Sequence, residues 1–145
     1  MKVFVDANTI VSGLLFVGNE SVLLELGRLR ALRLVSNEYV AQEVKRVLKR
    51  EEFSLEDEER QHLLRYTLEC ISVVEDPPEE EIKKHYDLLG DKKDLPVVLG
   101  AKKENCDYLV TGDRELLSKK VKLFVNSVTT SELLEKLVKE KFIRL

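Results

Sequence analysis

The sequence predicts a single α/β domain, built on a parallel sheet that carries helices on both faces. Short apolar runs alternate with longer amphipathic stretches along all 145 residues, and no internal repeat stands out. Strands that alternate with helices are typical of parallel sheets, because each crossover helix packs on one face of the sheet. A chain of this length is expected to form one domain, here 1–145, with a hydrophobic core of its own.

The expected strands are short apolar runs that end at polar or turn-forming residues. They cover residues 3–5, 32–35, 71–74, 108–111 and 122–125. The expected helices begin at residues that suit a helix start. They begin near Ser21, Ser36 or Asn37, Ser54, Pro78, Asp94 and Thr129, and end near Leu29, Arg50, Glu69, Leu89, Glu104 and Lys139. Gly90 is expected to terminate the helix that begins at Pro78, and a short helix is expected over residues 114–117.

The composition, 43% hydrophobic and 35% charged, indicates an ordinary soluble chain. No apolar run approaches the roughly 18 residues that cross a membrane, and Met1 leads directly into a strand without a secretory signal pattern. A cytoplasmic location without membrane association is therefore expected. The two cysteines lack the spacing of a zinc site or disulfide framework, and the two histidines are expected to be solvated surface residues.

Two aspartates stand directly after expected strands. Asp6 follows the run 3–5, and Asp113 follows the run 108–111 after Gly112. Because parallel sheets bind ligands in a crevice outside the carboxyl ends of their strands, both carboxylates are expected there. Each could instead be an ordinary helix cap or turn residue. Asn8 and Thr111 would place an amide and a hydroxyl beside them.

Two further acids belong to helices that begin near the same edge. Glu43 has valines around it at helical spacing, so it lies on an apolar face where a carboxylate is paired, protonated or metal-bound. A partner Arg or Lys, or a stripe edge that stays wet, is the alternative. Asp94 precedes the apolar run 95–101, and Asp91 competes with it from one helical turn earlier. Spacing alone does not decide which of these two aspartates reaches the crevice.

Four carboxylates in one crevice would repel each other strongly unless a cation neutralised them. A set of oxygen ligands suits Mg²⁺ or Mn²⁺, which activate water and polarise phosphoryl oxygens. The acids therefore predict a metal site for phosphate chemistry. Other α/β classes fit less well, because the stretch 6–8 lacks the second aspartate of haloacid dehalogenase phosphatases and no Gly-rich phosphate loop is present.

The order and spacing of these stretches resemble a PIN domain over nearly the whole chain. The resemblance rests on Val-Asp-Ala-Asn at 5–8, Tyr-Val-Ala-Gln-Glu-Val at 39–44, Asp94 seven residues before Ala101, and Thr-Gly-Asp at 111–113. Residues 107–117 look especially like the VapC-like toxin ribonucleases of prokaryotes. The resemblance implies a three-layer α/β/α sandwich with a central five-stranded parallel sheet, and Mg²⁺- or Mn²⁺-dependent endonucleolytic cleavage of RNA.

The resemblance also implies roles for particular residues. The family's metal-binding and catalytic positions fall on Asp6, Glu43, Asp94 and Asp113, and its supporting polar positions fall on Asn8 and Thr111. Two departures, Pro96 close behind Asp94 and a long segment 77–90, leave Asp91 as an alternative ligand. Many relatives are toxins that form dimers and are blocked by an antitoxin, so a homodimer or higher oligomer and an antitoxin partner are expected.

Basic residues near the crevice are the expected RNA contacts. They are Lys92, Lys93 and Arg114, with Lys102, Lys103, Lys119 and Lys120 as further candidates, and each can equally be an ordinary exposed residue. The net charge of −3 neither indicates nor excludes a nucleic-acid partner, because clustered active-site carboxylates lower the total. Two alternatives to a toxin stay open: a catalytically silent module that binds RNA or protein, and an RNA-maturation nuclease.

Overall fold

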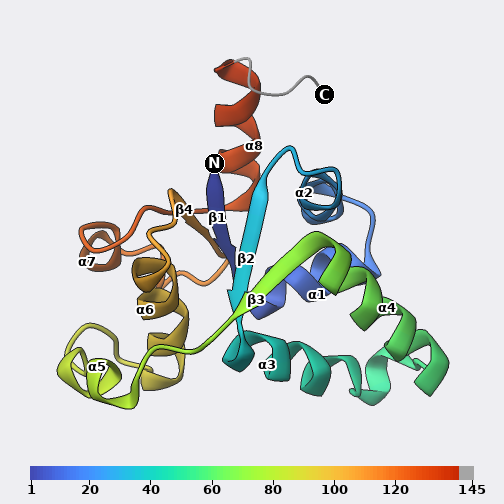
Figure 1. Cartoon of the computed structure of the whole chain (residues 1–145), viewed down its shortest axis with the longest axis horizontal. Coiled ribbons are helices and arrows are strands. Elements are labelled where there is room, and N and C mark those ends of the chain that lie inside the picture. The colour runs from blue at the N-terminus through green and yellow to red at the C-terminus, as the bar shows by residue number, and fades with distance from the viewer. Residues whose placement is uncertain (141–145) are drawn as a thin grey trace.

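The computed structural model describes residues 1–140, which form a three-layer α/β/α sandwich around a five-stranded parallel sheet (Figure 1). The strands lie in the order β3-β2-β1-β4-β5. They are β1 (Lys2–Val5), β2 (Arg33–Asn37), β3 (Ile71–Val74), β4 (Tyr108–Val110) and β5 (Ser127–Val128). Every neighbouring pair is parallel, so all five carboxyl ends lie at one edge of the sheet. The fold class predicted from the sequence is confirmed.

The helices form the two outer layers (Figure 1). One side of the sheet carries α1 (Ala7–Leu15), α2 (Asn19–Arg28) and α4 (Asp57–Cys70), and the other carries α6 (Leu95–Lys103) with α5 (Glu79–Lys84) beside it. Helix α3 (Glu38–Leu48) crosses beyond the carboxyl ends of the strands, and α8 (Thr130–Lys139) packs against α2. Three short elements complete the chain: η1 (Glu51–Phe53), η2 (Lys92–Asp94) and α7 (Lys119–Lys122).

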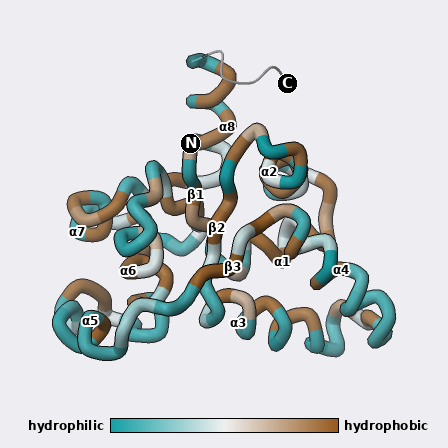
Figure 2. Tube along the Cα trace, viewed as in Figure 1, coloured by the Kyte–Doolittle hydropathy of each residue, from teal (hydrophilic) through white to brown (hydrophobic). Residues whose placement is uncertain are grey.

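The core follows from the continuous apolar runs of the central strands. Val3, Phe4 and Val5 of β1 are all 0% exposed, as expected for a strand that helices cover on both faces. Figure 2 shows hydrophobic stretches along the central strands and more hydrophilic ones along the outer turns of α3 and α4. Within residues 1–140 no single helix is long and apolar enough to cross a membrane; α1 and α2 pass that test only together, across a bend of 96°.

Asn37 joins the two helices that carry the predicted acids Glu43 and Asp94. Its Oδ1 accepts from the Val40 N–H (3.1 Å) and caps α3, while its Nδ2 donates to the Pro96 carbonyl in α6 (3.0 Å). The side chain is 0% exposed, and of the two cap candidates, Ser36 and Asn37, it is Asn37 that caps the helix. This buried amide therefore sets the distance between α3 and α6 at the carboxyl edge of the sheet.

Replacing Asn37 by Ala is expected to lower the free energy of unfolding by about 2 kcal/mol. The loss combines a missing helix cap, roughly 1 kcal/mol, with the lost buried hydrogen bond to the Pro96 carbonyl, roughly 0.5–1.5 kcal/mol. Urea denaturation measures it. The matched control is Asn126→Ala, which removes only an exposed amide bonded to the Asp107 carbonyl (3.3 Å) and should cost less than about 0.5 kcal/mol. Equal losses in the two variants would contradict the assignment.

The strand expected over residues 122–125 is wrong. Ser118 caps α7 by accepting from the Val121 N–H (3.3 Å), and Val121 is buried while Leu123 is 91% exposed. The apolar spacing predicts a strand, but of Val121 and Leu123 only Val121 reaches the core. The fifth strand is the two-residue β5, which pairs with β4.

The helix expected from Pro78 to Leu89 is shorter than predicted. It ends at Lys84, and the chain then turns so that Leu89 reaches the core. Gly90 does not terminate a helix; its N–H donates to the Glu115 carboxylate. His85, at the end of α5, is half-buried with its ring 5.3 Å from that of Phe124, so it is not the solvated residue that was expected.

Two expected helix starts are displaced along the chain. Helix α2 begins at Asn19, and Ser21 lies inside it, where its Oγ accepts from the Gly18 N–H (2.9 Å). Ser54 has a left-handed backbone (φ 48°) after η1, and α4 begins at Asp57 instead. The final helix is as predicted: Thr129 and Glu132 form its capping box.

Candidate active site

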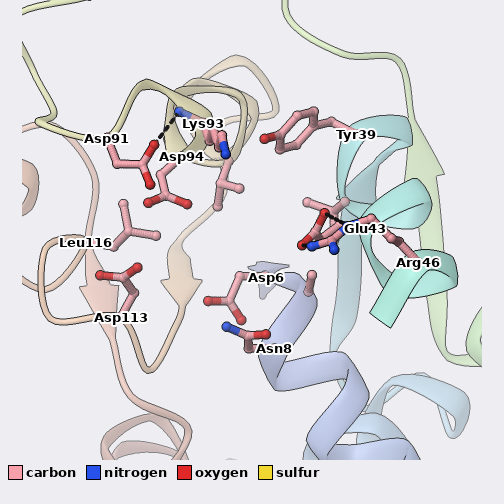
Figure 3. Close-up of a pocket in the computed structure, with 13 residues that line it drawn as sticks. Asp6, Asn8, Tyr39, Glu43, Arg46, Asp91, Lys93, Asp94, Asp113 and Leu116 are labelled. Atoms are coloured by element: carbon pink, nitrogen blue, oxygen red, sulfur yellow. Dashed lines mark hydrogen bonds and ion pairs between the residues drawn. The ribbon is translucent and has the colours of Figure 1, made fainter. Parts of the chain in front are cut away.

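A pocket of about 450 Å³ opens at the carboxyl edge of the sheet (Figure 3). Elements from four distant parts of the chain line it: the start of α1, one face of α3, the η2–α6 segment and the turn after β4. The ionisable side chains in its lining are Asp6, Tyr39, Glu43, Arg46, Asp91, Lys93, Asp94 and Asp113. The structure thus brings together all four acids singled out in the sequence, and the alternative Asp91 with them.

Asp6 lies at the floor of this pocket, between β1 and α1. Its Oδ1 accepts from the Thr9 N–H (2.9 Å), so it caps α1, and its Oδ2 accepts from the Thr111 hydroxyl (2.5 Å). The residue is 7% exposed. Burial raises the pKa of the Asp6 carboxyl, and the nearby Asp113 charge adds to this, while the bonds from Thr9 and Thr111 oppose it.

Thr111 links the two strand-end aspartates, although it does not itself line the pocket. Its hydroxyl donates to Asp6, and the same oxygen accepts from the Asp113 backbone N–H (3.0 Å). The residue is 1% exposed, so no solvent competes for these bonds. These bonds hold the Asp6 carboxylate in one orientation relative to Asp113.

Asp113 begins a turn rather than a helix. Its Oδ1 accepts from the Glu115 N–H (2.8 Å), and its carbonyl accepts from the Leu117 N–H (3.1 Å). Residues 114–117 are consecutive turns, so the short helix expected there is wrong. The carboxylate still lies against the pocket, on the wall opposite Glu43 (Figure 3).

Asp94 stands at the cap position of α6, but its carboxylate makes no capping hydrogen bond. Pro96 lies in the first turn and lacks an N–H, so that turn offers one donor fewer. The side chain lines the pocket instead. Burial raises its pKa to about 6, and the negative charges of Asp113, Asp91, Glu115 and Asp6 add to the effect. Asp91 differs, because its Oδ1 accepts from the Lys93 N–H (3.0 Å) in the η2 turn.

Glu43 lies at the pocket edge of the apolar stripe on α3, and its side chain is 38% exposed. Arg46, one turn later, donates to it from both Nε (3.2 Å to Oε2) and Nη2. This bond lowers the pKa of the Glu43 carboxyl. Both alternatives to a core carboxylate, a partner Arg and a stripe edge that stays wet, are present in the structure. Glu43 nevertheless faces the other acids (Figure 3).

Sequence reasoning missed two side chains of this pocket, Tyr39 and Arg46. With Glu43 they lie at positions i, i+4 and i+7 of α3, which places them on one face of the helix. Burial and the charges of Glu43 and Asp94 raise the pKa of the Tyr39 phenol. The same helical spacing, applied to the polar residues rather than to the valines, would have found this face.

Only some of the basic residues predicted to contact RNA lie at the pocket. Lys93 lines the pocket, whereas Lys92 and Arg114 do not. The Lys92 ammonium lies 4.7 Å from the centre of the Tyr86 ring and donates to the Tyr86 carbonyl (3.1 Å). Asn8, the predicted amide beside Asp6, is exposed and lines the pocket.

The donor set of the pocket fits a hard divalent cation. Its candidate ligands are carboxylate oxygens, and the raised pKa values of Asp6 and Asp94 mean that their negative charges lack sufficient compensation. Across residues 1–140 no group of three acidic, histidine or cysteine side chains is placed so that all three could hold one metal ion. Mg²⁺ suits such an open arrangement, because it retains several water ligands and needs only one or two carboxylates.

Neutralising Asp94 is expected to stabilise the metal-free protein at about pH 8 but not at about pH 4. Since its folded pKa is about 6, above the ordinary 3.8, the folded state binds the proton more tightly, and stability is lost as the pH rises through this window. Asp94→Asn has no carboxyl to ionise at this position, so its stability should not fall in this way as the pH rises. Because the group is partly exposed, we expect about 1 kcal/mol, or a melting temperature about 2–4 °C higher. Thermal melts of both proteins in EDTA across the pH range measure it.

The matched control for this experiment is Asp87→Asn, at an exposed aspartate outside the pocket. It removes the same charge and should leave the pH dependence of the melting temperature unchanged. If Asp94→Asn gave the same small shift at every pH, the buried and repelled carboxyl described above would be wrong.

The fold and the acidic pocket together define a PIN domain, and the chain belongs to this family: the family model described as "PIN domain" matches residues 2–115. Among solved structures, the chain is similar to PAE2754 from Pyrobaculum aerophilum, at 21% identity and a TM-score of 0.71, with 96% of each chain covered. It is also similar to VapBC2 from Rickettsia felis bound to a DNA fragment from their promoter, at 17% identity and a TM-score of 0.67, with 89% of this chain and 98% of that one covered. The comparison with curated proteins found no match.

Proposed function

We propose that this protein is a Mg²⁺- or Mn²⁺-dependent endoribonuclease that hydrolyses RNA phosphodiester bonds. The observation that carries the proposal is the convergence of Asp6, Glu43, Asp94 and Asp113 on one pocket, where burial and mutual repulsion raise the pKa of Asp6 and Asp94. The ionised forms of Asp6 and Asp94 cost folding stability, which a bound cation would offset. Membership of the PIN family supports a nuclease.

We assign different roles to the acids on the two sides of the pocket. Asp6 and Asp113 are fixed to each other through Thr111, so they form one rigid unit at the ends of β1 and β4. Asp94 faces this unit from α6, and its carboxylate is free of capping bonds. A divalent ion bound by these oxygens would activate a water and polarise the scissile phosphate. Glu43 would then orient that water from α3, where Arg46 keeps its carboxylate ionised.

The test is cleavage of single-stranded RNA by the purified protein in Mn²⁺, Mg²⁺ or EDTA. We expect cleavage with either ion and none in EDTA, and we expect Asp6→Asn to be inactive. If wild type and Asp6→Asn give the same metal-independent background, the nuclease proposal fails. A folded protein that binds RNA or a protein without cleaving would then be the catalytically silent module.

We further propose that the nuclease is the toxin of a toxin–antitoxin pair, acting in the cytoplasm as a homodimer or higher oligomer that an antitoxin blocks. Support comes from the similarity in fold to VapBC2. The test is growth: induced expression of the chain should arrest a bacterial host, and Asp6→Asn should not. Co-expression of a small neighbouring reading frame should restore growth. Without arrest, but with cleavage in vitro, an RNA-maturation nuclease is the better description.

A further inference from the structure

The α3 wall of the pocket carries a charged group, the Arg46 guanidinium, to which the proposed chemistry assigns only the contact with Glu43. We infer that Arg46 binds a phosphate of the RNA strand next to the scissile one, and so is a substrate-positioning residue. The inference rests on the proposed RNA substrate. It depends on the charges in the pocket, on the hydrogen bonds of Arg46, and on the place of Arg46 along α3.

The side chains that line the pocket are mostly anionic, so an RNA phosphate is attracted to the positions where the pocket carries a positive side chain. Five carboxylates line it against two cations, Arg46 and Lys93. Most other lysines considered as RNA contacts bind backbone carbonyls elsewhere. They are Lys92 on Tyr86, Lys102 on Phe124, Lys103 on Glu75 and Lys120 on Asp87. Arg46 and Lys93 are therefore the cations that an RNA backbone meets at the pocket itself.

Arg46 retains donors for a second partner. Its bonds to Glu43 use Nε and Nη2, and Nη1 makes no hydrogen bond within residues 1–140. The side chain is 62% exposed, so an incoming phosphate reaches these N–H groups without rearranging the fold. The guanidinium can donate to Glu43 from its Nε–Nη2 edge and to a phosphate oxygen from its remaining N–H groups. A lysine ammonium is a point charge without this planar arrangement of donors, so it holds two anionic partners less specifically.

The position of Arg46 on α3 indicates the direction in which a bound RNA strand would leave the acids. Tyr39, Glu43 and Arg46 follow each other along one helix face, and at 1.5 Å per residue the face spans about 10 Å from Tyr39 to Arg46. Figure 3 shows Tyr39 across from Asp94 and Lys93, with Arg46 farther along α3. An RNA strand that leaves the acids along α3 therefore passes Arg46, on the side away from Lys93.

The experiment measures RNA affinity against salt for wild type, Arg46→Gln, Arg46→Lys and the control Lys45→Gln. Lys45 is the adjacent residue and has the same charge, but it lies on the other flank of α3 beside an apolar cavity. A labelled single-stranded RNA is titrated with protein in Ca²⁺, with gels to check that the strand stays intact. For one lost phosphate contact, the slope of log affinity on log salt should fall by about 0.7 in Arg46→Gln.

We expect the wild-type slope in Lys45→Gln, and a slope restored by Arg46→Lys with weaker binding. Mn²⁺ titrations without RNA, followed by thermal melting, separate the two roles of Arg46. If Arg46→Gln keeps the wild-type salt slope and lowers only the apparent affinity for Mn²⁺, then Arg46 merely restrains Glu43 and the inference is overturned. Absence of measurable RNA binding by wild type overturns it too. Cleavage in Mn²⁺, scored separately, reports on the proposed nuclease function itself.

Discussion

Replacing Asp6 by Asn is expected to reduce metal-dependent RNA cleavage by roughly 10³-fold while leaving the protein folded. The carboxylate lies at the floor of the pocket and is bonded both to α1, through Thr9, and to the segment after β4, through Thr111. Asn caps a helix as well as Asp does, so α1 should keep its cap. The substitution removes a buried carboxylate whose ionised form is unfavourable, but it also replaces the oxygen that accepts from Thr111 by an NH2 donor, so the melting temperature in EDTA should change little. Single-turnover cleavage and thermal melts measure the two effects.

Thr111→Val is expected to give a smaller loss of cleavage rate than Asp6→Asn, so it serves as an intermediate in this experiment. It keeps the shape of the side chain but removes the hydroxyl that donates to Asp6 and accepts from the Asp113 N–H. Because Thr111 only orients the carboxylates, the loss in rate should be about 10–100-fold, smaller than for Asp6→Asn. The exposed control Asp87→Asn should cleave like wild type. An Asp6→Asn protein that cleaved at the wild-type rate would remove Asp6 from the metal site.

Saturating Mn²⁺ is expected to raise the melting temperature by about 5–10 °C near pH 8 and by far less near pH 5. At about 100 times its dissociation constant a ligand contributes about 2.7 kcal/mol, and each kcal/mol corresponds to about 2–4 °C in a chain of this size. Near pH 5 the Asp94 carboxyl, with its pKa of about 6, is largely protonated, and the raised pKa of Asp6 acts in the same direction. Protons therefore compete with the ion.

Two comparisons make this prediction specific. Asp94→Asn should lose most of the Mn²⁺-induced shift near pH 8, whereas Asp87→Asn should keep it. An equal ionic strength of KCl should produce no comparable shift, because screening of exposed charges is weak stabilisation compared with occupancy of a site. A shift of equal size at both pH values would show that the ion binds somewhere other than this pocket.

The catalytic candidates could be predicted from the sequence because strand ends and helix starts can be recognised locally. Asp6 and Asp113 each follow a run of buried strand residues, and all parallel strands end at one edge. The position of Glu43 on the helical wheel was less informative. It predicts a carboxylate in the core, yet the Glu43 side chain is 38% exposed and bonded to Arg46. The carboxyls with raised pKa values are those of Asp6 and Asp94.

The errors in the predicted elements share one physical cause. Over residues 122–125 and 84–89 the apolar pattern suited a strand and a helix, but the burial of single side chains decided the backbone. Val121 enters the core from the short helix α7 and Leu89 from the loop after α5, and Leu123 remains exposed. Such choices depend on the space left by elements distant in sequence, so no local pattern contains them.

The sequence by itself determined the parallel sheet, four of its five strands and the identity of the four acids, because these depend on local periodicity and on where strands end. Only the tertiary structure decided how charged the pocket is and which groups line it. Asn37 joins α3 to α6, Thr111 joins Asp6 to Asp113, and Arg46 comes to the pocket as one of its two cations. Hydrogen bonds, burial and repulsion between distant segments exist only after the chain has folded, and these set the electrostatics of the site.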